Sequence, residues 1–197
     1  GSIEIKSGKG FQESGSINMG TGKAVELSGG VEIKSGDAVS SSGGIMLSGG
    51  SSTTQGGAIQ LIAGMSSGEI GGSVELKSGS GGAGKGGDIK GVTGQSTGAT
   101  SGSIDLATGN AFSSGGVAIK TGAGELNSGS VSFVVGEAGG NGGNIIMTAG
   151  KGSEDTAQGG NVKLSSGSSV TGVGGELNIQ AGDSELSNGG AVTIQSG

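Results

Sequence analysis

The 197-residue chain contains 52 glycines but only three aromatic residues, a composition that does not suit a globular core packed from bulky side chains. Sixteen acidic residues against ten lysines give a net charge of −6, the wrong sign for neutralising phosphates, so we expect no nucleic-acid partner. Cysteine and histidine are both absent, which excludes disulfides, thiolate metal sites and a histidine general base.

The order of apolar residues along the chain shows a repeat. Fourteen units each contain two apolar positions separated by one residue, and successive units begin 13 to 17 residues apart. The first apolar residues of the units are Ile3, Ile17, Val31, Ile45, Ile59, Val74, Ile89, Ile104, Val117, Val131, Ile145, Val162, Leu177 and Val192.

The second position, two residues later, is apolar in every unit except the seventh, which has Gly91. Its other occupants are Ile5, Met19, Ile33, Leu47, Leu61, Leu76, Leu106, Ile119, Phe133, Met147, Leu164, Ile179 and Ile194. An alternating run bounded by glycine is typical of a short strand with one buried face. We therefore predict that the two sets of apolar residues form the structural core.

A weaker feature follows about eight residues after the first position of several units, and it is interpreted as a return strand. It comprises Phe11, Val25, Val39, Thr53, Thr97, Phe112 and Val170. Glycines between the two strands suit positive-φ corners of tight turns. The expected fold is all-β: a flattened parallel β-solenoid of about 14 coils, with 13–17 residues and two short strands per coil.

We expect residues 1–197 to form a single repeat solenoid. Both ends fall in phase with the repeat, which indicates a piece of a longer array or a filament subunit with open strand edges. Two apolar side chains per unit cannot offset the conformational entropy of about 14 residues, so a single coil is not stable alone. Self-association by end-to-end stacking is therefore the expected partnership.

The outward-facing positions support stacking. Each apolar pair encloses one residue, and in a stack these enclosed residues form a column. No two neighbours in this column carry like charges, and Glu75, Lys90 and Asp105 alternate in sign. Some outward positions are apolar, and they are either tolerated scatter or sites of lateral packing between solenoids. They are Met46, Ile62, Val92, Val134 and Ile146.

No motif indicates catalysis, a cofactor or a metal. Residues 79–86, GSGGAGKG, lack the final hydroxyl residue of a phosphate-binding loop, and the glycine-rich turns lack the aspartate spacing of calcium-binding repeats. Ice-binding solenoids present flat arrays of threonine in T-x-T motifs. No T-x-T motif occurs in this sequence. No apolar run approaches the roughly 20 residues that span a bilayer, so no membrane insertion is expected.

The unit G-x-[VI]-x-[IL]-x-[STA]-G, in phrases such as GGSVELKSG and GGAVTIQSG, resembles the long Gly/Ser-rich repeat proteins of algae and other protists. The resemblance covers the whole chain and implies a secreted or surface β-solenoid of largely unassigned role, and the family offers no catalytic residues to carry over.

The function expected from the sequence is structural. We expect a non-enzymatic protein, extracellular or at the cell surface, that builds a fibre, sheath or appendage. The alternative is a module that binds ice, mineral or polysaccharide through a flat repetitive face.

Overall fold

The computed structural model describes all 197 residues and contains no helix and no strand. The predicted β-solenoid is therefore wrong for this chain, and so are its two strands per coil. A solenoid requires each circuit to form a backbone ladder with the next. Here every hydrogen bond joins residues at most ten positions apart, which is less than one repeat.

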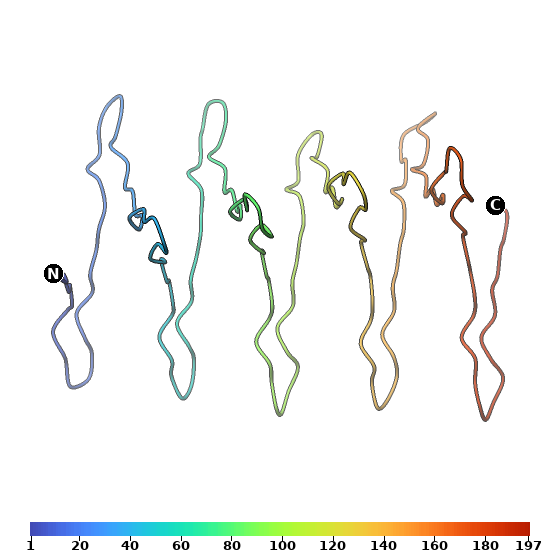
Figure 1. Ribbon diagram of the computed structural model, residues 1–197, viewed down its shortest axis with the longest axis horizontal. Helices are drawn as coiled ribbons and strands as arrows, with labels where there is room; N and C mark the ends of the chain where they lie inside the picture. Colours follow the sequence, from blue (N-terminus) through green and yellow to red (C-terminus); the bar gives the residue numbers. More distant parts are fainter. The chain divides into compact units, whose positions relative to one another are not determined.

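The chain runs through a series of loops joined by short segments (Figure 1), and these short segments carry the apolar pairs of the repeat. We define an apolar segment as the four residues that start at the first apolar position of a unit. Each loop begins at the glycine five residues after that position and ends at the glycine two residues before the next one. The loops are 8–15, 22–29, 36–43, 50–57, 64–72, 79–87, 94–102, 109–115, 122–129, 136–143, 150–160, 167–175 and 182–190.

Both ends of all thirteen loops are glycine, which explains why the same short phrase returns along the sequence. In six loops the closing glycine N–H donates to the opening glycine carbonyl, at 2.8–2.9 Å; an example is Gly72 to Gly64. We call this junction the neck. In the fourth unit the Ser48-Gly49 pair arrives one residue early. The loop still closes at the usual positions, because the Gly57 N–H donates to the Gly50 carbonyl.

Close packing at the neck requires glycine and a small neighbour. A Cβ atom on Gly87 would lie 3.3 Å from the Ser78 Cβ, and one on Gly72 would lie 3.4 Å from the Ala63 Cβ. The least exposed residues of the chain are Gly152 and six small residues that directly precede the opening glycine of a loop. They are Ser7, Ala63, Ser78, Thr93, Ala149 and Ala181, each four positions after the first apolar residue of its unit.

The predicted positive-φ role of glycine is wrong, because no glycine has positive φ. Thr156 alone has a left-handed backbone, with φ of 73°. It lies in the loop 150–160, where the Ala157 N–H donates to the Glu154 carbonyl at 3.0 Å. A positive φ at the third residue of a four-residue turn is the signature of a type II turn. At the necks glycine serves close approach rather than unusual backbone angles.

The predicted return strands do not form. The residues assigned to them lie instead at bends at the loop tips. Phe11, Val25, Val39 and Phe112 all lie at bends and are fully exposed. A bend occurs in each of the thirteen loops. Serine hydroxyls accept backbone N–H groups in five of them, as at Ser66 and Ser169. Such local bonds satisfy the backbone within a turn and favour turns over strands.

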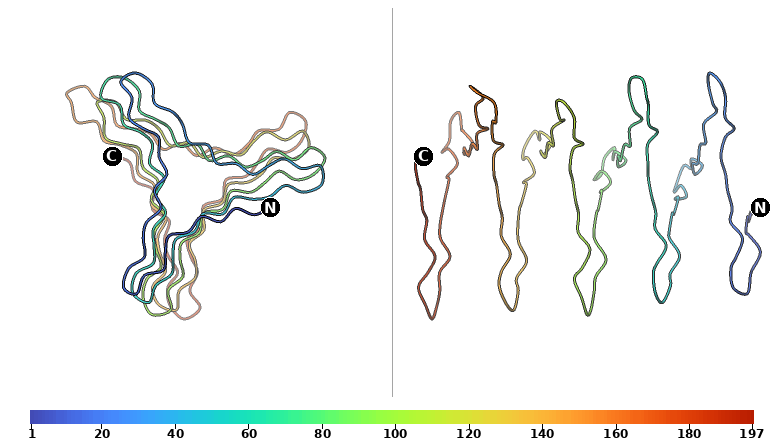
Figure 2. Two further views of the ribbon diagram at one scale, coloured as in Figure 1. Left: turned by 90° about the vertical axis from the view of Figure 1, so that its left-hand side faces the viewer. Right: turned by 180° about the vertical axis from the view of Figure 1, so that it is seen from behind.

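The chain divides into two units, Gly1–Ser103 and Ile104–Gly197, and the boundary falls between repeats. Each unit contains seven apolar segments. Within each unit the loops project outward in three directions in turn, as the end-on view in Figure 2 shows. The apolar segments connect the bases of consecutive loops.

Candidate functional site

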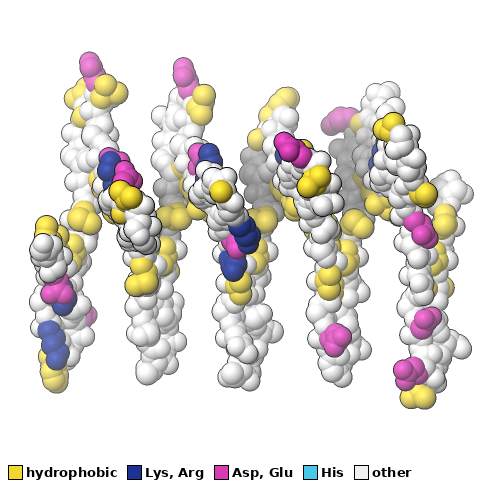
Figure 3. Space-filling model, in the orientation of Figure 1, with side chains coloured by type: hydrophobic (Ala, Val, Ile, Leu, Met, Phe, Trp, Pro, Cys, Tyr) yellow, Lys and Arg dark blue, Asp and Glu magenta, His cyan; other side chains and the backbone are white.

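The structure has no hydrophobic core, because no residue of the chain is buried. The apolar pairs that were predicted to fill the interior lie partly exposed on the apolar segments. Away from the termini, the first position is exposed by 46–63% and the second by 58–77%. The space-filling view shows hydrophobic side chains lying open on the surface (Figure 3). Their predicted burial therefore does not occur within one isolated chain.

The two sides of an apolar segment differ in exposure. In the fourth segment, Ile45 and Leu47 are 53% and 67% exposed, whereas Met46 between them is 88% exposed. All five apolar residues at outward positions, named above as candidates for lateral packing, are 80–89% exposed. Each segment thus presents a partly sheltered apolar side and an open side.

One place in the second unit brings the apolar side chains of successive repeats together. Phe133 from one segment and Ile145, Ile146 and Met147 from the next line a cavity of about 320 Å³. All four side chains are apolar, and each remains at least half exposed. The cavity is therefore an open hydrophobic surface and belongs to the same set of apolar segments.

The backbone of the apolar segments is unpaired. The structure contains seven backbone–backbone hydrogen bonds, six at necks and one in the turn at Glu154, and none of them involves an apolar segment. A folded chain of this length forms about 200 hydrogen bonds. The apolar segments therefore carry free N–H and C=O groups beside their exposed side chains.

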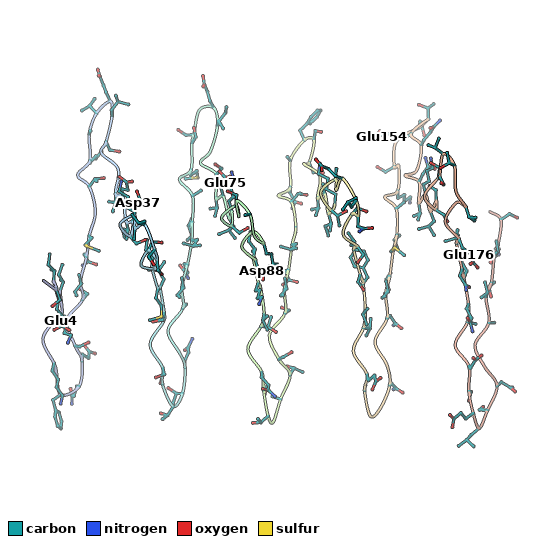
Figure 4. The ribbon with its side chains drawn as sticks, in the orientation of Figure 1. Glu4, Asp37, Glu75, Asp88, Glu154 and Glu176 are labelled. Atoms are coloured by element: carbon teal, nitrogen blue, oxygen red, sulfur yellow. The ribbon has the colours of Figure 1, made fainter.

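Three isolated ion pairs are present among the charged side chains. On the open side of two segments, Lys6 contacts Glu4, and Lys34 lies 3.2 Å from Glu32. Lys85 and Asp88 are 2.8 Å apart. No group of three or more carboxylates gathers to form a metal site. The acidic side chains labelled in Figure 4 come from different repeats or from different parts of one repeat.

The site that the geometry offers is thus the set of fourteen apolar segments. The sequence identified its side chains but not their exposure. Unpaired backbone could not be recognised from the sequence, because period-two alternation shows which side chains share a face and not what the backbone bonds to. The chain contains no helix that could span a membrane.

No protein-family model, curated protein or solved structure matches the chain.

Proposed function

We propose that this protein is a structural subunit that assembles with copies of itself into an extracellular fibre, sheath or surface appendage. The observation that carries the proposal is the exposure of every apolar segment. Contiguous exposed apolar surface marks an interaction surface, and here an exposed pair of apolar positions recurs in every unit except the seventh, which has Gly91.

The energetics of a single chain support assembly. Ordering a residue costs about 1–2 kcal/mol in backbone entropy, and burial of apolar surface is the main compensation. A chain without a buried residue lacks that compensation. Association between copies can supply it, since the apolar segments and their free backbone groups are then covered.

The regularity of the surface supports copies of the same chain as the partner. The fourteen segments share one pattern, apart from Gly91 in the seventh, and they recur every 13 to 17 residues along the chain. A partner with the same spacing can engage all of them together, and each additional contact then adds to the affinity without a further loss of translational freedom.

Negative-stain electron microscopy of the purified protein tests the proposal. We expect uniform filaments at concentrations at which sedimentation detects few single chains of 18.2 kDa. Filaments should shorten or disappear on dilution, because the assembly is held by contacts between copies. Dispersed single particles, with thermal hysteresis of ice growth in the same sample, would contradict the proposal and favour an ice-binding module.

A further inference from the structure

The amount of exposed surface shows how extensive the contact between copies must be. A compact monomer of this mass exposes about 8,000 Å², whereas this chain exposes 19990 Å². A partner in a standard protein interface loses only about 800 Å². One patch cannot account for a difference of about 12,000 Å². The contact must run along the whole chain.

The apolar segments can form such a contact on both edges. Their N–H and C=O groups are unpaired, and an unpaired extended segment is a template for another extended segment. A second copy supplies segments of the same length and the same alternation. Since each segment has two free edges, each needs a neighbour on both sides.

The direction of the loops indicates how many copies take part. Within a unit the loops point in three directions in turn (Figure 2). The loops of one unit project from a common axis. If a second copy is rotated about this axis by one third of a turn, each of its loops points in the direction of the next loop of the first copy. Three copies related in this way place successive repeats of different copies side by side.

We propose that the building block of the assembly is a homotrimer with threefold symmetry, a proposal that rests on the self-assembly proposed above. Each apolar segment lies between two neighbours, namely the segment of the preceding repeat in one partner and that of the following repeat in the other. The copies run parallel, and neighbouring segments are paired through their backbones and staggered by one repeat.

The charges of the first unit favour this stagger. Adjacent parallel segments lie about 4.8 Å apart, where like charges repel. With a stagger of one repeat, Glu4 lies beside Asn18 of a neighbour, and Glu75 lies beside Lys90. Without a stagger, each glutamate would face the identical glutamate of the next copy. The sequence therefore distinguishes the staggered trimer from an in-register stack.

Cysteine cross-linking tests the arrangement, because the natural chain has no cysteine. The double variant Gln60→Cys, Glu75→Cys changes two exposed positions between the apolar residues of consecutive repeats. The proposed neighbours lie within the Cα separation that a disulfide spans. On oxidation we expect most of the protein to migrate as a covalent trimer, at three times the 18.2 kDa of one chain.

The controls are each single variant and the pair Gln60→Cys, Lys90→Cys, whose positions are two repeats apart. All three should remain at the mass of one chain. Dimers of a single variant would reveal an in-register stack and overturn the proposal. A ladder beyond three copies, a disulfide within one chain, or no cross-link at all in the Gln60/Glu75 pair would also overturn it.

The outcome is separable from that of the fibre proposal. Filaments whose cross-linked species extend beyond three copies would support the fibre proposal and exclude the trimer. A covalent trimer that forms no filaments would support the trimer and contradict the fibre.

Discussion

Replacement of Val162 by aspartate is expected to abolish assembly while leaving the isolated chain unchanged. Val162 is 58% exposed in the single chain, so a carboxylate there remains hydrated. In the assembly the same position lies against apolar side chains of a neighbour, where burial of an unpaired charge costs several kcal/mol. Sedimentation velocity should show single chains of Val162→Asp at concentrations at which the natural protein is fully assembled.

Thr193→Asp is the matched control. It introduces the same charge between the two apolar residues of a segment, at a position on the open side that remains in contact with water. We expect it to assemble nearly as well as the natural protein, since an exposed substitution changes stability by about 0.5 kcal/mol or less. Equal assembly of the two variants would show that the two sides of the segments are wrongly assigned.

Replacement of Gly72 by valine is expected to open one neck and lower the melting temperature of the assembly. A Cβ at this position would lie 3.1 Å from the Gly64 nitrogen and 3.4 Å from the Gly64 oxygen, which accepts the Gly72 N–H. The two arms of the loop must move apart by a few tenths of an ångström, which weakens the hydrogen bond. Together these effects should cost about 1–3 kcal/mol per copy.

The control for this variant is Gly68→Val, at the tip of the same loop. A Cβ on Gly68 meets no atom within 4 Å, and its backbone φ is not positive. We expect its melting temperature, measured by circular dichroism at the same protein concentration, to stay close to that of the natural protein. If both variants lower the melting temperature equally, the close packing at the neck does not stabilise the assembly.

The sequence predicted the repeat and its boundaries but not how the repeats are joined. The glycines at the two ends of each unit were visible as a pattern, and the loops close between them at contacts such as Gly64 and Gly72. The tips were misread, because Phe11 and Phe112 recur at a regular distance from the apolar segments and suggested a second strand. A residue at a fully exposed bend can recur just as regularly as one in a core.

The error in fold has a physical cause. Alternation at Val162 and Leu164 shows that two side chains share one side of the backbone. It does not show whether the backbone bonds to the same chain or to another, since both arrangements select the same residues. The predicted solenoid places these bonds within one chain. The structure leaves these segments unpaired and their side chains at least half exposed, so the alternation does not produce a buried face within one chain.

The central claim is that contacts between copies, and not a core within one chain, stabilise this protein. Thermal melting followed by circular dichroism over a hundredfold range of concentration tests it directly. The account predicts a melting temperature that rises with protein concentration, because association stabilises the ordered state by mass action. A cooperative transition at the same temperature throughout, in a sample that sedimentation shows to be single chains, would contradict it.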